Sequence, residues 1–262
     1  MTARSTFTQV APGIWVATAT IWTSITTAIV GPDGGYVLVD PGITVPELEA
    51  RAHESRARDW RVVAGFSTHP HWDHVLWRAD WAGVPRWATP EAVASQARTR
   101  DADLARADAE APGQDRQLFG RLTPLPPGTT TLPWDGPDVH VVAHKAHAPG
   151  HAALAVPHAG ALLAGDMLSD LEIPLLDTDA EDPLGDYWAG LEALERAVAE
   201  HGLHTLVPGH GHVGDAAELA RRLAADRRYL DALASGRLPE DDRLRTPWLA
   251  DAHREHVERI GA

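Results

Sequence analysis

The sequence predicts an α/β protein, because β-rich segments and amphipathic helices alternate along its 262 residues. Two β-branched segments, 14–19 and 25–30, lead through a Gly- and Pro-containing turn to a third strand at 36–40. A helix with one apolar face is expected at 46–58, ahead of an apolar strand at 61–66. This order of elements is compatible with two stacked sheets flanked by helices or with one doubly wound sheet.

The alternation continues to the C-terminus. Thr89 is a candidate N-cap, with proline at the first helical position, for a helix that extends to about Ala111. The Pro- and Gly-rich stretch 112–137 predicts a loop with short strands at 117–122 and 129–132. The other expected elements are a short helix at 75–81, strands at 139–143, 152–156, 161–163 and 203–207, and helices at 186–200, from 215 to about 235, and at 247–260.

The hexapeptide 69–74, His-Pro-His-Trp-Asp-His, carries four metal-ligating side chains within six residues. Residues two apart in an extended segment point to the same side, so His69 and His71 are expected to share one ion. The following turn would direct Asp73 and His74 toward a second ion. Imidazole and carboxylate donors suit zinc, and also iron or manganese. A solvated histidine-rich loop is the alternative, which four ligands at this density disfavour.

Three more candidate ligands follow, each after an apolar run and a glycine or Pro-Gly turn: His151, Asp166 and His210. With the hexapeptide, this ordered set resembles the metallo-β-lactamase-fold hydrolase superfamily. The pattern of that family is H-x-H-x-D-H, then P-G-H, then G-D at a strand end, and a late G-H. The resemblance extends from about Val37 to His212, and every ligand position is filled.

The resemblance implies the fold and the domain organisation. It favours the four-layer αββα sandwich of the metallo-β-lactamase fold over the doubly wound sheet. It further implies one domain over residues 1–262, with C-terminal helices from about residue 215.

The resemblance also implies a dinuclear metal site, with two zinc ions expected and iron or manganese as alternatives. A hydroxide that bridges the two cations would be the nucleophile, and Asp73 and Asp166 are the expected catalytic carboxylates. Asp166 would bridge both ions. The ligands of the first ion would be His69, His71 and His151, and those of the second would be Asp73, His74 and His210.

Four further residues are candidates for supporting this site. Asp40, at the end of the strand 36–40, either orients a ligand histidine or only forms a turn before Pro-Gly. His147 precedes the Pro-Gly-His turn and is a candidate for a similar orienting role. Trp72 is expected to pack beside the metals and Trp22 to shape an apolar pocket, although tryptophan is more often a core residue.

Two positions narrow the reaction class that the resemblance implies. Family members that reduce oxygen or nitric oxide usually carry glutamate where this chain has His71, which favours hydrolysis. Asp166 is typical of thioesterase, lactonase and phosphodiesterase relatives. The expected substrate is therefore an ester, thioester or lactone of a small molecule. A phosphodiesterase, a mononuclear iron persulfide dioxygenase and a non-catalytic, metal-stabilised binding protein are the alternatives.

Composition bears on partners and location. The net charge of −14 disfavours binding to nucleic-acid phosphates or to anionic membranes. The chain has no cysteine, so disulfides and thiolate ligands are excluded. No apolar signal core or membrane-spanning run is visible, which favours a cytoplasmic protein. A small-molecule substrate is the expected partner, and the sequence leaves a homo-oligomer open.

Overall fold

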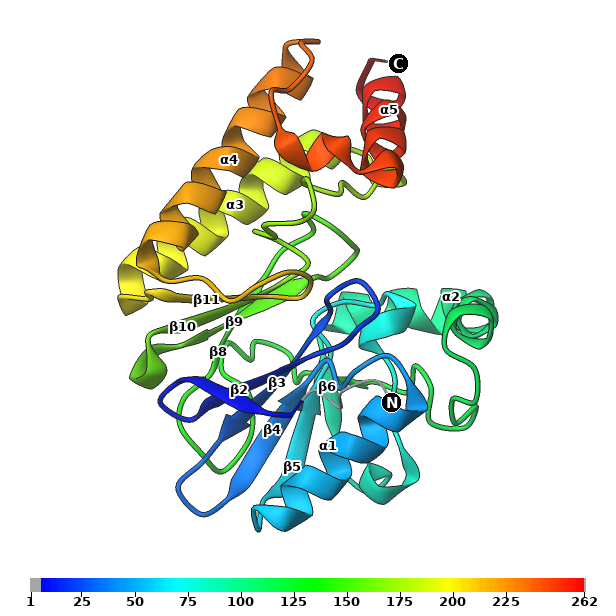
Figure 1. Ribbon diagram of the computed structural model, residues 1–262, viewed down its shortest axis with the longest axis vertical. Helices are drawn as coiled ribbons and strands as arrows, with labels where there is room; N and C mark the ends of the chain where they lie inside the picture. The colour runs from blue at the N-terminus through cyan, green and yellow to red at the C-terminus, as the bar shows by residue number, and fades with distance from the viewer. Residues whose placement is uncertain (1–5, 262) are drawn as a thin grey trace.

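The computed structural model describes residues 6–261. Over that range, five α-helices flank two β-sheets that stack face to face (Figure 1). The predicted αββα sandwich is therefore confirmed, and the doubly wound alternative is excluded because the strands divide between two sheets.

The larger sheet is built from the first half of the chain, and its strands follow one another in sequence order from β1 to β7. Strands β1 to β4 are antiparallel, whereas β4 to β7 are parallel. The strands are β1 (Thr8–Ala11), β2 (Ile14–Thr18), β3 (Ile25–Val30), β4 (Gly35–Val39), β5 (Arg61–Phe66), β6 (Arg86–Ala88) and β7 (Thr123–Pro124).

The smaller sheet comes from the second half, in the order β11-β10-β9-β8. Its strands are β8 (His140–Ala143), β9 (Ala152–Val156), β10 (Ala161–Gly165) and β11 (Thr205–Pro208). Strands β8, β9 and β10 are antiparallel, and β10 and β11 are parallel. Parallel neighbours end at the same edge of a sheet, so the residues that follow β10 and β11 emerge side by side.

The helices lie on the outer faces. Residues of α1 (Val45–Ala57) and α2 (Pro90–Glu110) share an apolar cluster with the larger sheet. Residues of α3 (Pro183–His201) and α4 (Ala216–Ala234) do the same with the smaller sheet, and α5 (Pro247–Gly261) stands beyond them (Figure 1). The N-cap predicted at Thr89 is present, since its side chain accepts a hydrogen bond from Ala92 N, and Gly202, in a left-handed conformation, ends α3.

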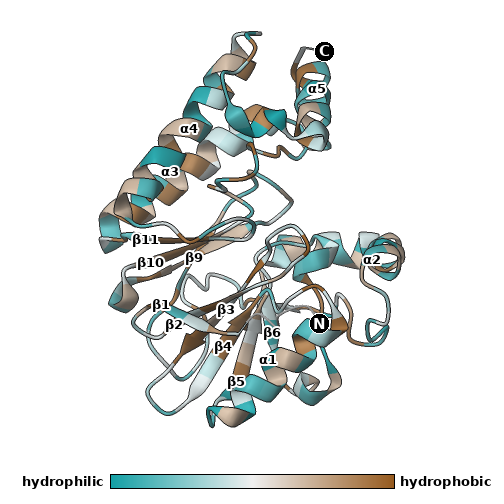
Figure 2. Ribbon diagram, viewed as in Figure 1, coloured by the Kyte–Doolittle hydropathy of each residue, from teal (hydrophilic) through white to brown (hydrophobic). Residues whose placement is uncertain are grey.

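Burial on both faces of each sheet explains why the sequence pattern alone was ambiguous. In β4, Val37 and Val39 pack between the sheets, while Tyr36 and Leu38 pack against α1 and α2. A strand that is buried on both faces reads as a continuous apolar run without alternation. Figure 2 shows these hydrophobic strands beside helices on which hydrophilic and hydrophobic positions alternate. Among the described residues, no helix is long and apolar enough to cross a bilayer.

One predicted helix is wrong. Segment 75–81 is not one short helix: residues 75–78 are irregular and lie between two 3₁₀ turns, Trp72–His74 and Ala79–Trp81, the second of which forms the end of the segment. The buried guanidinium of Arg86 donates hydrogen bonds to the carbonyls of Val75 and Leu76 at 2.7 and 2.8 Å. The chain there is shaped by these bonds and not by helical ones.

The strand expected at 117–122 is also wrong, because those residues form a turn whose carbonyls at Leu118 and Arg121 accept hydrogen bonds from Arg86. Strands β1, β6 and β7 were not predicted. All three are short, with four, three and two residues, and none carries a long apolar run.

Candidate metal centre

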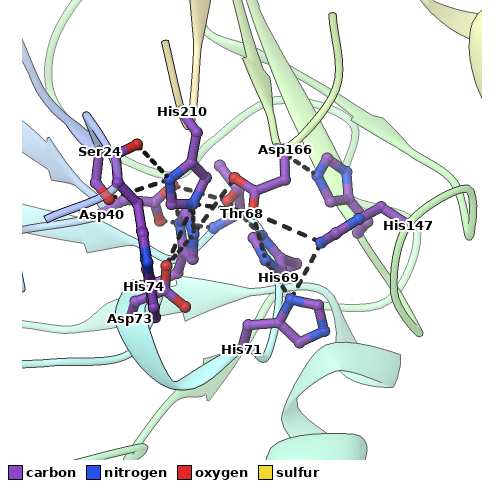
Figure 3. A network of polar contacts seen from close by, with 12 residues as sticks. Ser24, Asp40, Thr68, His69, His71, Asp73, His74, His147, Asp166 and His210 are labelled. Carbon is purple, nitrogen blue, oxygen red and sulfur yellow. Dashed lines mark hydrogen bonds and ion pairs between the residues drawn. The ribbon is translucent and has the colours of Figure 1, made fainter. Parts of the chain in front are cut away.

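The candidate ligands converge where strands of both sheets end (Figure 3). The hexapeptide 69–74 follows β5, while Asp166 follows β10 and His210 lies just beyond β11. The two sheets therefore each deliver ligands to a common edge of the sandwich. The structure brings them together in two groups that face one another across Asp166.

The first group consists of His69, His71, His147 and Asp166, with one ligand atom of each within 4.8 Å of the others. The Nδ1 atom of His71 lies 3.0 Å from His69 Nε2 and 3.1 Å from His147 Nε2. These distances bring three imidazole nitrogens to one point, as coordination of a single cation requires.

The second group consists of Asp73, His74 and His210, again within 4.8 Å of one another. The Nε2 atoms of the two imidazoles are 3.3 Å apart, and each lies 3.2 Å from Asp73 Oδ2. This is the set of residues that the sequence assigned to the second ion.

Asp166 touches both groups. Its Oδ1 lies 3.3 Å from His74 Nε2, and its Oδ2 lies 3.2 Å from His210 Nε2. The same Oδ2 lies 3.4 Å from His69 Nε2 and 3.6 Å from His147 Nε2. A carboxylate in this position can bridge two cations. Gly209 makes room for it, because a Cβ there would lie 2.0 Å from Asp166 Oδ1.

The structure corrects one assignment: His147, and not His151, completes the first group. His151 belongs to neither group. Its Nε2 accepts a hydrogen bond from the Asp166 amide at 3.1 Å, and its Nδ1 lies 3.2 Å from His144 Nε2. Both ring nitrogens of His151 are thus engaged, and the residue supports the backbone that carries Asp166. The tight turn at Gly150, with φ +68°, separates the two histidines.

Residues 20–210 match the sequence model of the metallo-beta-lactamase superfamily. The chain belongs to this superfamily. No curated protein matches the sequence closely enough to add to that assignment.

Solved structures of the superfamily share the fold. A beta-lactamase domain protein from Burkholderia ambifaria is 21% identical with a TM-score of 0.64, covering 90% of this chain and 78% of its own. A metallo-beta-lactamase from Pontibacter korlensis is 19% identical with a TM-score of 0.62, covering 85% and 99%. The metallo-beta-lactamase FIM-1 from Pseudomonas aeruginosa, in a mono-zinc form, is 14% identical with a TM-score of 0.64, covering 87% and 97%.

Four of the candidate ligand imidazoles have a partner at the ring nitrogen that faces away from the other ligands. Asp40 Oδ2 lies 3.0 Å from His74 Nδ1, as an orienting role for Asp40 requires. The hydroxyl of Thr68 donates to Asp40, so its oxygen is left to accept from His69 Nδ1 at 3.0 Å.

The other two imidazoles are held by backbone carbonyls. His210 Nδ1 lies 3.2 Å from the carbonyl of Trp22, and His147 Nδ1 lies 2.8 Å from that of Leu175. A carbonyl only accepts, so Nδ1 of each ring carries a proton, and Nε2 is the atom that each ring offers to a metal ion. Ser24, whose hydroxyl lies 3.1 Å from His210 Nδ1, adds to this support.

The two groups differ in their electrostatics. Burial lowers the pKa of His69 well below its usual value, and the neighbouring His74 adds to that effect. Burial also lowers the pKa of His147, to about 4. Burial opposes charge on His74 too, but Asp166, Asp73 and Asp40 raise its pKa well above the usual value. The pKa of His210 is raised in the same way, with Asp166 contributing most.

The donor set fits a metal ion. Asp166 Oδ1 is buried and makes no hydrogen bond, with His74 Nε2 3.3 Å away, and a metal ion between these two atoms would satisfy both. Burial tends to raise the pKa of the Asp166 carboxyl, but His210, His74 and His69 lower it well below the usual value. The group is therefore an anion, surrounded by nitrogen donors that suit zinc.

The two tryptophans singled out from the sequence lie together beside the second group. Trp72 is buried in the cluster that α1 and α2 share with the larger sheet. Trp22 is 44% exposed, and its ring meets that of Trp72 edge-on at 5.5 Å and lies 6.3 Å from the ring of His210. Trp22 and Thr23 both have a left-handed backbone, with φ 54° and 53°, so the loop between β2 and β3 is fixed in a form that exposes an aromatic ring next to the ligands.

Several supporting groups were missed by the sequence analysis. The carbonyls of Trp22 and Leu175 act through the backbone, which leaves no trace in residue identity. Thr68 and Ser24 are ordinary strand-end and loop residues. Glu172 is a further group that interacts with the charges of the site. Burial raises its pKa to about 7, His210 opposes this shift, and Asp166 and Asp73 add to it.

Proposed function

We propose that this protein is a metal-dependent hydrolase whose two ligand groups each hold one ion, with zinc as the native metal. The observation that carries the proposal is the position of Asp166, which lies within 3.2–3.4 Å of histidines from both groups. One carboxylate in contact with two sets of donors supports a pair of ions that share a ligand.

His69, His71 and His147 would hold the first ion, Asp73, His74 and His210 the second, and Asp166 both. The pair of ions would supply Lewis-acid activation of the scissile bond and of a water nucleophile. The chain itself supplies the orientation, because the contacts of Asp40, Thr68 and the two carbonyls orient four of the imidazoles before a metal ion binds. His151, which lies in neither group, is not among the proposed ligands.

The surroundings of the site support an acyl substrate. Trp22 offers an exposed aromatic face beside His210, next to buried Trp72. Such a surface favours an apolar acyl group over a highly charged one. With a net charge of −14, the chain also gives no general attraction for polyanions. We therefore propose an ester, thioester or lactone of a small molecule as the substrate class.

The test is metal analysis joined to a substrate screen. Protein freed of metal with a chelator would be reconstituted with zinc, iron or manganese, and bound metal would be counted by elemental analysis. Each form would be assayed with nitrophenyl esters, acyl thioesters, lactones and bis(nitrophenyl) phosphate. We expect two equivalents of zinc and turnover of at least one carboxylic ester class.

Other outcomes would point elsewhere. Preferential turnover of the phosphodiester would replace the acyl substrate class. One bound iron with sulfur-dependent oxygen uptake would replace hydrolysis by a dioxygenase reaction. Full metal occupancy without turnover of any class would support a binding protein, and no metal binding at all would overturn the proposal.

A further inference from the structure

We propose that the C-terminal helices α4 and α5 position the candidate metal ligand His147 through a continuous chain of hydrogen bonds that crosses the peptide between Leu175 and Leu176. Both helices lie beyond residues 20–210, the part of the chain that matches the superfamily. The inference rests on the proposed function in one respect, namely that His147 binds a metal ion. Its residues are positioning residues, since none of them touches the site.

The series of hydrogen bonds starts at His147 and passes through the peptide unit between Leu175 and Leu176. His147 Nδ1 donates to the carbonyl of Leu175 at 2.8 Å. The amide of Leu176, at the other end of that same peptide, donates to His256 Nε2 in α5 at 3.2 Å. Both polar ends of the peptide are therefore used, one toward the ligand and one toward the C-terminal helix.

The chain continues into α4. His256 Nδ1 lies 2.9 Å from the hydroxyl oxygen of Tyr229, and that oxygen lies 3.1 Å from His253 Nδ1. These three side chains are almost fully buried, with 3%, 1% and 7% of their surface exposed. Buried polar groups of this kind are costly unless each one finds a partner.

Every hydrogen bond in this series is donated in the same direction, from His147 toward His253. An amide can only donate, so His256 Nε2 accepts from Leu176 and the proton of the neutral ring sits on Nδ1. That proton is donated to Tyr229, whose own hydroxyl proton then points to His253. Hydrogen bonds aligned in one direction polarise one another, so the Leu175 carbonyl becomes a better acceptor for His147.

A second contact holds the same loop to α5. The guanidinium of Arg259 donates to the carbonyls of Thr178 and Ala180 at 2.9 and 2.7 Å. Together with the bond from Leu176 to His256, it anchors the segment 176–180 at three backbone groups. The loop that carries the Leu175 carbonyl is thus fixed by α5 on the side away from the metal centre.

The consequence is a defined tautomer and a defined ring orientation for His147. With its proton on Nδ1, its Nε2 lone pair faces the first ligand group, where His71 Nδ1 lies 3.1 Å away. Partners of ligand histidines typically change metal affinity about 10–100-fold when they are removed. Residues one step further out, such as His256, should act near the lower end of that range.

The experiment compares three variants of the full-length protein. His256→Phe keeps a ring of similar size and removes both hydrogen bonds. His256→Gln keeps an acceptor for Leu176 and a donor for Tyr229. Leu249→Ala removes a buried apolar side chain of α5 and leaves the hydrogen-bonded residues in place, so it controls for general loosening of that helix.

Two readouts are needed. Competition with a chromophoric chelator gives the affinity of each zinc equivalent. Nitrogen-15 NMR of the metal-free protein at pH 7 gives the tautomer of His147 without reference to metal or activity. For His256→Phe we expect one zinc equivalent to bind on the order of tenfold more weakly and His147 to populate both tautomers. His256→Gln should restore both properties.

The outcomes separate this inference from the proposed function. If the wild-type protein binds no zinc, the proposed function fails, while the tautomer of His147 still tests the chain. The inference is overturned if His147 keeps a single tautomer and both zinc affinities in His256→Phe. It is also overturned if Leu249→Ala causes the same loss, because packing alone would then explain it.

Discussion

The two ligand groups share Asp166 but differ in charge. The first group adds three imidazoles to that carboxylate, and burial lowers the pKa values of His69 and His147, so these rings stay neutral. The second group adds Asp73 to its two imidazoles, and Asp40 stands behind His74 at 3.0 Å. Carboxylates there raise the pKa values of His74 and His210, against the effect of burial.

Because of this difference, we expect the two groups to bind their ions with different affinities and for different reasons. Once a metal ion displaces the protons of its two imidazoles, the second group has more carboxylate charge close to the ion, so it should hold a cation more strongly and fill first. The first group is closer to neutral, and it depends on correctly oriented lone pairs more than on charge. Its ion should therefore respond more to changes in ligand orientation, and the ion of the second group more to changes in charge.

The largest effect is expected where the groups meet. Asp166→Asn removes the shared negative charge and should lower metal content and kcat/KM together. A loss of kcat/KM on the order of 1,000-fold is expected, since several kcal/mol of charge stabilisation are involved. Elemental analysis and kinetics with the best ester substrate measure both effects.

The matched control for that change is Asp226→Asn. Asp226 is as buried as a core residue but pairs with Arg243 at 2.8 Å, away from the candidate ligands. The Asp226→Asn variant should be less stable than the wild-type protein and should keep its full metal content. Normal metal content and activity in Asp166→Asn would show that the two groups do not share this carboxylate.

Substitution of single histidines should show which of the two ions each histidine binds. His147→Gln should lose the ion of the first group, and His210→Gln that of the second, so that each variant retains about one equivalent of zinc. His151→Gln keeps an acceptor for the Asp166 amide and should retain both ions. Loss of an ion in His151→Gln, with none lost in His147→Gln, would restore the assignment made from the sequence.

A smaller effect is expected from Asp40→Asn. The variant removes charge behind His74 but leaves the ligands in place, so zinc affinity of the second group should fall about 10–100-fold. Zinc affinity of the first group should change less, because Asp40 reaches His69 only through Thr68. Stepwise zinc titration measures the zinc affinity of each group separately. Equal losses of affinity at both groups would show that Asp40 does not act mainly on the second group.

The smallest effect concerns the pH dependence of the metal-free protein. The pKa of His147 is lowered to about 4, so its contribution to stability is present above pH 6.5 and is lost as the pH falls toward 4. It amounts to roughly 2 kcal/mol between pH 7 and pH 5. The pKa of His210 is raised, so its contribution is present below pH 6.5 and is lost as the pH rises through the folded-state pKa.

Denaturant unfolding of chelator-treated protein at pH 5, 7 and 9 measures these contributions. His147→Gln should reduce the acid sensitivity of the unfolding free energy, and His210→Gln should reduce its alkaline sensitivity. The same pH profile in both variants would show that the two groups do not differ in charge as described.

The features that could be predicted from the sequence are those whose residues lie next to one another in it. The hexapeptide 69–74 carries its own spacing, and helix starts such as Thr89 carry their own caps. The choice between His147 and His151 is different, because both flank the same Pro-Gly turn. Which ring reaches the metal centre is decided by long-range contacts, namely the Asp166 amide on His151 and the Leu175 carbonyl on His147.

The errors in the fold have the same origin. Segment 75–81 has a helical pattern, but Arg86 from later in the chain binds its carbonyls. The apolar runs of β4 and β10 were found, whereas their division between two sheets followed only from the family resemblance. Local patterns thus predicted most elements, and side chains that act across long sequence separations decided the remainder.

Anomalous diffraction at the zinc edge from a zinc-loaded crystal tests most directly whether Asp166 lies between two ions. We expect two peaks that flank the Asp166 carboxylate, about 3.5–4 Å apart, one beside His147 and one beside His210. A single peak, or peaks that do not contact Asp166, would contradict this expectation.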